Sequence, residues 1–379
     1  MRPRVVRARV VTVSDRRLSL RSRRIVGGAA AGVGAAAAVG WALQHSGVSR
    51  AVVTEGEIES EGLVLPDDLR HRFVDVDDGG RIHVVEGGSG PPLVLLHGFM
   101  LDSSIWAHQF RDLCGRHRVI AVDHRGHGRS VAGSDGFAAS RASSGGGSET
   151  LAGAVPMASA GVGAPGVRRL AADLAAVLEE IAVHDALVVG HSMGGMVALQ
   201  FAQDFAVTMR SRICGLVLAS TSAGPFSALP GWAGMTRLAA PASARAVIAA
   251  ERLGVATVPS RDLRYWLVRL GFGGDAPPTQ VRFTEALHLA TQPRTVAGLL
   301  SSLAVFDLSA SLGSIEEPTL VVVGTHDRIT PPRQARRMVN ALQRAELVEL
   351  PRCGHMAMIE RPHEFSHLLD EFSAKTTSR

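Results

Sequence analysis

The sequence predicts an α/β fold in which helices flank a mostly parallel sheet of eight strands. Short apolar runs alternate with helical patterns, an arrangement typical of parallel strands joined by crossover helices. The chain has 379 residues, of which 46% are hydrophobic, and this allows one large domain with a complete core. Several apolar runs also end in residues of catalytic type, in the chain order of a catalytic triad carried on successive strand ends.

The expected elements follow one another along the chain. We predict strands near residues 72–77, 81–86, 93–97, 118–123, 186–191, 214–220, 319–324 and 345–350. Core helices are expected near residues 103–114, 167–183, 193–206, 332–344 and 362–373. Residues 70–223 and 307–379 would then form the core domain, after a linker at residues 45–69.

Two segments interrupt this core. Residues 131–166 are rich in Gly, Ser and Ala, a composition that cannot bury a core and predicts a flexible insertion, with a functional lid as the alternative. Residues 224–306 carry Trp232, Tyr265 and Trp266 within amphipathic helical patterns, and we expect a helical cap over the site. Helices packed away from the site are the alternative. A cap rich in Leu, Ala, Val and Met predicts an apolar pocket for an acyl or alkyl group.

The most specific motif is a strand–turn–helix pattern around Ser192. An apolar run ends in Gly-His-Ser-Met-Gly at residues 190–194, and an Ala/Leu/Val-rich helical stretch follows. In such a nucleophile elbow the serine occupies a strained turn, and its hydroxyl is exposed above the sheet. Gly190 and Gly194 lack Cβ atoms, so the strand and the helix can pack closely around this turn. Ser192 is therefore the candidate nucleophile.

An acid and a base follow the serine at the ends of two later strands. Asp327 comes after the apolar run at 319–324, and His355 follows the run at 345–350. A hydroxyl is a poor nucleophile until a base removes its proton, and imidazole suits that role. A buried carboxylate fixes the tautomer of the imidazole and stabilises its cation. The order Ser192, Asp327, His355 predicts a triad, while a helix N-cap remains the alternative role for Asp327.

An oxyanion formed on the substrate needs two hydrogen-bond donors. The backbone N–H of Met193 lies at the start of the helix that follows the serine. The second donor should belong to a loop after an early strand, and the turn His97-Gly98-Phe99 follows the run at 93–97. We therefore expect Met193 and Phe99 to form the oxyanion hole, with an ordinary glycine turn as the alternative for the second segment.

Together these motifs resemble the α/β-hydrolase superfamily over about residues 70–373. The matching segments are residues 97–99, 123–130, 190–195, 324–327 and 354–355. Within the superfamily the chain is similar to the esterase, lipase and haloperoxidase-like branch of actinobacterial type. Epoxide hydrolases and haloalkane dehalogenases carry an Asp at the elbow, where this chain has Ser192.

The resemblance implies an α/β-hydrolase fold and a carboxylic ester hydrolase of the EC 3.1.1 type, acting on a small ester through an acyl-enzyme. The apolar cap adds the expectation of a lipophilic acyl group. The same triad also fits a haloperoxidase-like perhydrolase, a carbon–carbon bond hydrolase or an acyltransferase. A non-enzymatic binding protein is a further alternative, and it would be expected to show a broken triad.

The basic character of the chain is concentrated at its N-terminus. Residues 1–24 contain nine Arg and one Asp, whereas the whole chain has a formal charge of +5, so the remaining residues are net acidic. This asymmetry gives no reason to expect nucleic-acid binding. Residues 25–44 carry no charge and are long enough to span a bilayer, with the arginines on the cytoplasmic side. We expect a membrane anchor or export signal that places the catalytic domain outside the cytoplasm, and a cytoplasmic enzyme is the alternative.

The sequence indicates neither a cofactor nor a metal. Its three cysteines, Cys114, Cys214 and Cys353, make no disulfide framework. Metal-ligand spacings and a phosphate-binding glycine loop are both missing from the sequence, since Gly126-His127-Gly128 lacks the third glycine of a dinucleotide fingerprint.

Overall fold

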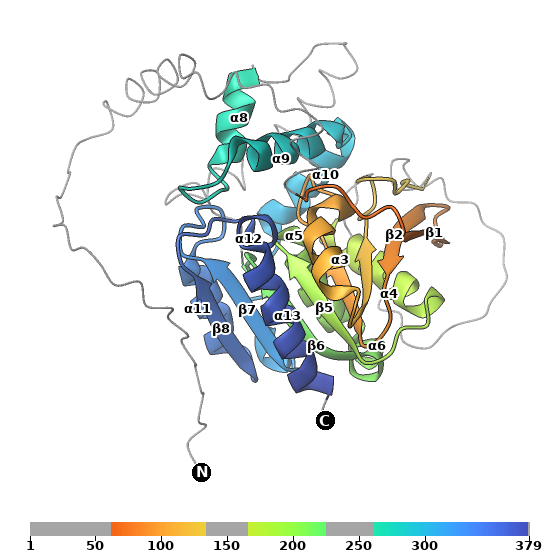
Figure 1. Ribbon diagram of the computed structural model, residues 1–379. Helices are drawn as coiled ribbons and strands as arrows, with labels where there is room; N and C mark the ends of the chain where they lie inside the picture. Colours follow the sequence, from red (N-terminus) through yellow and green to blue (C-terminus); the bar gives the residue numbers. More distant parts are fainter. Residues whose placement is uncertain (1–61, 134–165, 225–260, 378–379) are drawn as a thin grey trace.

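The computed structural model describes residues 62–133, 166–224 and 261–377 (Figure 1). The predictions for the basic arm at 1–24, the uncharged segment at 25–44, nearly all of the insertion and the first part of the cap lie outside these residues. Within them, no helix is both long and apolar enough to cross a membrane.

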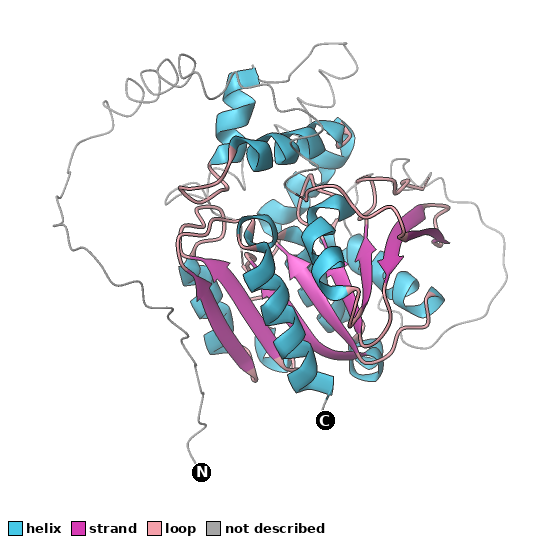
Figure 2. Ribbon diagram, viewed as in Figure 1, coloured by secondary structure: helices cyan, strands magenta, loops and turns pink. Residues whose placement is uncertain are grey.

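An eight-stranded sheet forms the centre of the molecule (Figure 2). Its strands are β1 (Arg70–Asp75), β2 (Arg81–Gly87), β3 (Pro92–Leu96), β4 (Arg118–Val122), β5 (Ala186–His191), β6 (Ile213–Ala219), β7 (Thr319–Gly324) and β8 (Ala345–Leu350). They lie in the order β1-β2-β4-β3-β5-β6-β7-β8. Only the pairs β1–β2 and β2–β4 are antiparallel, so six neighbouring strands run parallel and their carboxyl ends meet at one edge.

Helices cover both faces of the sheet. Their bounds are η2 (Ser103–Trp106), α3 (Ala107–Leu113), α4 (Val167–Glu180), α5 (Met193–Asp204), α6 (Ala206–Arg212), α8 (Arg261–Arg269), α9 (Pro278–Ala290), α10 (Pro293–Val305), η4 (Leu312–Ser314), α11 (Pro332–Ala341), α12 (Ala357–Glu360) and α13 (Pro362–Thr377). Helices α3, α12 and α13 pack on one face, and α4, α5 and α11 pack on the other.

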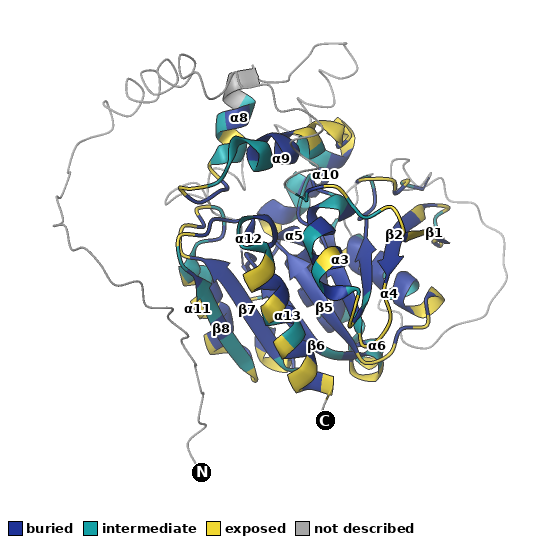
Figure 3. Cartoon of the chain, in the orientation of Figure 1, coloured by how far each residue is buried: buried dark blue, intermediate teal, exposed yellow. Residues whose placement is uncertain are grey.

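The period-two alternation of strand side chains creates two apolar cores. In β5, Val188 belongs to the core under α4 and α5, whereas Leu187 and Val189 belong to the core under α3 and α13. All six residues of β5 are buried, as expected for a central parallel strand covered on both faces (Figure 3). This burial holds the carboxyl end of β5 in a rigid frame.

The predicted strands all occur, with ends that differ by about two residues or fewer. The helix expected at 103–114 begins as a 3₁₀ turn, and the side chain of Asp102 caps this turn by accepting a 2.9 Å hydrogen bond from Ser104 N. The helix expected to end near residue 206 is broken at Phe205, and α6 follows as a separate short helix.

The described part of the predicted cap contains α8, α9 and α10. Helices α8 and α9 lie beyond the edge of the sheet at which β5 ends (Figure 1). Tyr265, Phe272 and Phe283 are buried in the same apolar cluster as one sheet face. Helix α10 packs beside α4, where Ser302 Oγ accepts a 3.0 Å hydrogen bond from Val167 N.

Candidate active site

Ser192 lies in a tight turn between β5 and α5. Its backbone has φ 52° and ψ −116°, a left-handed conformation that costs free energy in a residue other than glycine. Gly190 has no room for a side chain, since a Cβ there would lie 2.5 Å from the carbonyl oxygen of Gly194. The structure therefore holds the strained elbow that the sequence predicted, with Ser192 at its tip.

Asp327 and His355 lie side by side at the carboxyl ends of β7 and β8. His355 Nδ1 is 3.0 Å from Asp327 Oδ2, and both side chains are buried. An ionised carboxylate only accepts hydrogen bonds, so Nδ1 must carry the proton. The other ring nitrogen, Nε2, is then unprotonated in the neutral imidazole and is free to act as a base.

The surroundings of Asp327 favour its ionised form. Burial by itself raises the pKa of this carboxyl, but the charge and hydrogen bond of His355 and the bonds from Thr330 outweigh it, and the net pKa is lowered. Oδ1 accepts 2.9 Å hydrogen bonds from Ile329 N and Thr330 N, and Oδ2 accepts one of 2.9 Å from Thr330 Oγ1. These donors also fix the carboxylate in one orientation. The sequence did not identify Thr330, because nothing distinguishes it locally from a helix-starting threonine.

His355 lies directly beside the elbow. Nε2 of His191, the residue before the serine, donates a 3.0 Å hydrogen bond to the carbonyl of His355, and the two rings are 4.8 Å apart. Burial lowers the pKa of His191 to about 3, so its ring is neutral at ordinary pH. Within the described residues, no hydrogen bond joins Ser192 Oγ to His355. Such bonds are often long in free enzymes and tighten when substrate binds.

The two predicted oxyanion donors lie on segments that touch. A Cβ on Gly194 would lie 2.2 Å from the carbonyl oxygen of Leu96, so the loop after β3 packs tightly on the start of α5. Across the described ranges, the backbone N–H groups of Phe99 and Met193 donate no hydrogen bond to another protein group. Met193 is also the first residue of α5, where the helix dipole favours a negative charge.

Neutral histidines support the loop after β3 that carries Phe99, one of the two predicted oxyanion donors. His97 Nε2 accepts a 2.9 Å hydrogen bond from His124 N, and His127 Nε2 accepts one of 3.2 Å from Met100 N. Burial lowers the pKa of His127 to about 4 and holds the pKa values of His97 and His124 well below the usual range. Each accepting nitrogen must be unprotonated, so the geometry of this loop depends on neutral rings.

Glu360 is a site residue that sequence analysis missed. Its carboxylate accepts hydrogen bonds from Gly273 N at 2.6 Å, Gly354 N at 3.0 Å and Met356 N at 3.2 Å. The cap segment after α8 and the loop of His355 are also joined by a 2.6 Å hydrogen bond from His355 N to the carbonyl of Gly271. Glu360 thus ties the cap segment after α8 to the loop that carries His355. A single glutamate in a four-residue helix gives no sequence signal for this role.

Other candidate residues have structural partners. Asp123 accepts hydrogen bonds from His83 Nδ1 at 2.7 Å, Ser103 N at 2.7 Å and Arg129 N at 3.0 Å, so it braces the loop after β4. Burial raises the pKa of the Cys353 thiol, which disfavours a thiolate nucleophile. The part of the chain that the structure describes contains no group of three or more His, Cys, Asp or Glu residues able to hold a metal ion.

Comparison with known proteins identifies the family. A family model described as the α/β-hydrolase fold matches residues 91–362, which is more than half of the chain. The chain belongs to the α/β-hydrolase family. It is 28% identical over 290 residues to the pimeloyl-[acyl-carrier protein] methyl ester esterase of Nitrosospira multiformis, covering 75% of this chain and 95% of that protein.

Two solved structures have a similar fold. A thermophilic esterase from Thermogutta terrifontis superposes with a TM-score of 0.62 and 26% identity, over 81% of this chain and 99% of that one. Est816, described as an N-acyl homoserine lactone degrading enzyme, gives a TM-score of 0.58 and 25% identity, over 79% of this chain and 100% of that one. This α/β-hydrolase is accordingly an enzyme of the ester-hydrolase type.

Proposed function

We propose that this enzyme hydrolyses carboxylic esters with a lipophilic acyl group through the triad Ser192, His355 and Asp327. The observation that carries the proposal is the buried 3.0 Å hydrogen bond between His355 Nδ1 and Asp327 Oδ2, next to a strained serine elbow. Nucleophile, base and orienting acid come from the ends of β5, β8 and β7, so a rigid sheet holds all three.

In the first half of the reaction, Ser192 Oγ attacks the ester carbonyl while His355 Nε2 takes the hydroxyl proton. The carbonyl π-electrons move to oxygen, and the N–H groups of Phe99 and Met193 stabilise the oxyanion. The tetrahedral intermediate collapses, its carbon–oxygen bond to the alcohol breaks, and His355 gives its proton to the departing alkoxide. Asp327 stays ionised and stabilises the imidazolium in between.

In the second half, water attacks the acyl-enzyme with His355 again as base. The proton passes from water to Nε2 and then to Ser192 Oγ as the carboxylic acid leaves. The free enzyme is restored without a redox step. Every proton in this cycle moves through one nitrogen, Nε2 of His355.

The character of the cap supports a lipophilic acyl group. Tyr265, Phe272, Val281 and Phe283 of the cap are buried in the apolar cluster that continues into the sheet. An apolar wall favours an acyl chain by the free energy of removing its methylene groups from water, about 0.8 kcal/mol for each one buried. The acyl preference should therefore rise with chain length before the pocket is filled.

A series of p-nitrophenyl esters from acetate to dodecanoate tests this proposal. We expect kcat/KM to increase over the first members and to be lost in Ser192→Ala. Product analysis with added peroxide, with an alcohol acceptor and with a β-diketone separates hydrolysis from perhydrolysis, acyl transfer and carbon–carbon cleavage. A wild-type enzyme that cleaves none of the esters, or that prefers acetate over all longer chains, would contradict the proposal.

A further inference from the structure

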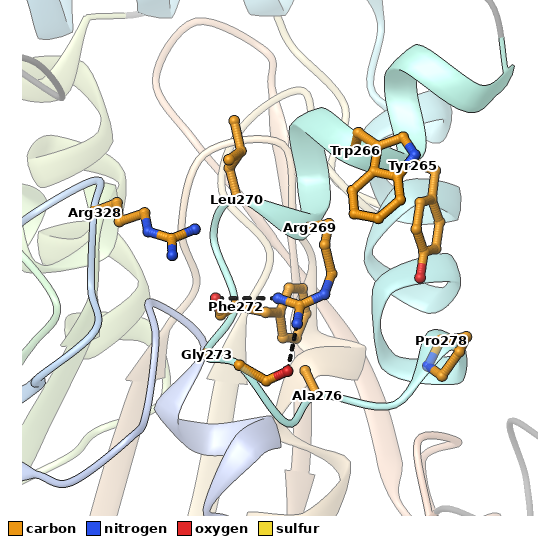
Figure 4. A pocket seen from close by; sticks show the side chains of 10 residues that line it. Tyr265, Trp266, Arg269, Leu270, Phe272, Gly273, Ala276, Pro278 and Arg328 are labelled. Carbon is orange, nitrogen blue, oxygen red and sulfur yellow. Dashed lines mark hydrogen bonds between the residues drawn. The ribbon is translucent and has the colours of Figure 1, made fainter. Parts of the chain in front are cut away.

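A pocket lies beside the proposed catalytic loops. It has a volume of about 460 Å³ and lies between the segment that joins α8 to α9 and the loop after β7 (Figure 4). Tyr265, Trp266, Phe272 and Leu270 give it an apolar wall. This volume falls within the range of pockets that bind small organic molecules.

Two arginines bring positive charge to this apolar pocket. Arg269 donates to the carbonyls of Phe272 at 3.3 Å and Gly274 at 2.7 Å, which fixes its side chain in the wall. Arg328 lies on the opposite side, and its guanidinium points toward the other lining residues (Figure 4). Among the residues that the structure describes, those that line the pocket include no Asp or Glu, so none of them neutralises either charge.

Arg328 is available to a ligand. It is exposed and, among the described residues, its guanidinium makes no hydrogen bond or ion pair with another protein group. The guanidinium of Arg336, by contrast, is paired, since it forms hydrogen bonds of 2.7 and 2.9 Å with the carboxylate of Glu349. A free, planar guanidinium offers two parallel N–H donors, a geometry that matches a carboxylate or a phosphate.

The pocket lies next to the segments that carry the proposed acid and base. Arg328 directly follows Asp327 in the chain. Across the pocket, the carbonyl of Gly271 accepts the 2.6 Å hydrogen bond from His355 N, and a Cβ on Gly271 would lie 4.0 Å from His355 Cβ. A ligand in the pocket would therefore contact Arg328, the residue after the proposed acid, and the segment that is hydrogen-bonded to the loop of His355.

We propose that this pocket binds the far end of an ester substrate, an apolar chain or ring that terminates in an oxyanion. Arg328 binds the anionic group, and the aromatic side chains of Tyr265, Trp266 and Phe272 contact the apolar part. The inference rests on the proposed ester hydrolysis and names its substrate class: amphiphilic esters with a carboxylate or a phosphate at the end remote from the scissile bond.

A matched substrate pair tests the preference. The p-nitrophenyl monoester of adipic acid carries a free carboxylate, and its methyl-capped counterpart is neutral at the same chain length. We expect wild-type enzyme to favour the carboxylate ester, and Arg328→Gln to lower the ratio of the two kcat/KM values about tenfold, the effect of losing about 1.4 kcal/mol of binding. Arg328→Lys should restore part of the ratio, because it keeps the charge but not the planar pair of donors.

Arg337→Gln is the matched control. Arg337 is an exposed arginine of α11 that does not line the pocket, so its loss changes the net charge equally. For Arg337→Gln we expect the ratio of the two kcat/KM values to equal that of the wild type. An unchanged ratio in Arg328→Gln, or an equal fall in both variants, would overturn the proposal, because the preference would then be absent or due to general electrostatics.

A binding measurement separates this inference from the proposed reaction. Calorimetry on Ser192→Ala compares hexanoate, hexyl phosphate and hexanol, which share an apolar chain. We expect at least one anion to bind about tenfold more tightly than hexanol, with the stronger of the two identifying the anionic group, and the advantage to disappear in the Ser192→Ala/Arg328→Gln double variant. Equal binding of all three would overturn the pocket assignment, whereas tight anion binding without any esterase activity would contradict only the proposed function.

Discussion

Asp327 shows how one buried charge can be held in place by a few short contacts. Its two oxygens accept from His355, from Ile329 N, and from the N–H and hydroxyl of Thr330. A buried carboxylate is stable only if its lost hydration is replaced, and these four donors provide that replacement. The same donors keep it ionised, so it can stabilise a protonated His355.

Asp327→Asn removes the charge while preserving the size of the side chain. We expect kcat to fall by about 10⁴-fold, because the amide favours the wrong imidazole tautomer and cannot stabilise the cation. The pKa of Asp327 in the folded protein lies below its pKa in the unfolded chain. The ionised carboxylate therefore stabilises the wild-type fold at pH values above the unfolded pKa, and this stabilisation is lost as the pH falls through the folded pKa. Steady-state kinetics with p-nitrophenyl butyrate measures the effect on rate.

The control is Asp185→Asn. Asp185 is an exposed residue just before β5, at the opposite edge of the sheet from the site. The substitution Asp185→Asn should leave kcat within about twofold of the wild-type value, as expected of a surface substitution away from the site. Near-wild-type kcat in Asp327→Asn would show that another carboxylate orients His355.

At the scale of elements, the site depends on how the cap segment is fastened to the core. Glu360 of α12 binds backbone N–H groups on both sides of this junction, Gly273 from the cap segment and Gly354 from the loop after β8. Burial raises the pKa of Glu360, and the backbone donors oppose that rise. The carboxylate thereby positions the loop that carries His355.

Glu360→Gln should loosen this junction. The amide keeps an acceptor oxygen but turns an N–H₂ group toward backbone donors, so we expect a loss of about 1–3 kcal/mol in the free energy of unfolding. The value of kcat should fall more than KM rises, because the position of His355 changes rather than the acyl pocket. Glu364→Gln, on an exposed position of α13, is the control and should match the wild type in both assays. Equal urea stability and kcat in the two variants would contradict the role of Glu360.

The strands β3 to β7 were predictable because each one is a short, largely apolar run bounded by turn residues, and Leu187 to Val189 are typical. The elbow was predictable because its glycines and serine are adjacent in sequence. The roles of Glu360 and Thr330 were not predictable, since their partners come from other loops and only the folded chain brings them together. Phe205 likewise breaks a helical pattern that has no proline or glycine to mark the break.

At the scale of the whole molecule, four buried neutral histidines make stability sensitive to acid. They are His97, His124, His127 and His191, and each has a lowered pKa chiefly because of burial. In the unfolded chain a histidine titrates near pH 6.5. Below that pH the unfolded chain binds protons that the folded chain does not, so the folded state loses stability as the pH falls. The loss ends at the pKa of each histidine in the folded protein, which is about 4 for His127 and about 3 for His191.

Urea unfolding at several pH values measures this loss. The free energy of unfolding should fall below about pH 6.5, by up to about 1.4 kcal/mol per pH unit for each histidine. His127→Gln should flatten the slope, because the glutamine amide oxygen can take the place of Nε2 and accept the bond from Met100 N without titrating. His184→Gln, at an exposed position, should leave the slope unchanged. A stability that stays constant from pH 7 to pH 5 would contradict this account.

The location of the enzyme is a separate proposal that concerns residues outside the described ranges. We propose that the uncharged stretch at 25–44 anchors or exports the protein, with the catalytic domain outside the cytoplasm. Fractionation of cells that express the full chain or a version starting at Val48 tests it. We expect only the full chain in the membrane or exported fraction. If both forms are found equally in the cytoplasmic fraction, the enzyme is cytoplasmic.

The central claim is that Ser192 is the nucleophile, and covalent labelling tests it most directly. A fluorophosphonate probe reacts with a serine only when a base and an oxyanion hole activate it, so peptide mapping of the labelled enzyme identifies the residue. We predict one modified peptide, labelled at Ser192, no labelling of Ser192→Ala, and a fall in ester hydrolysis of about 10³-fold or more in that variant. Labelling at another serine, or persistent labelling and hydrolysis in a folded Ser192→Ala, would contradict the account.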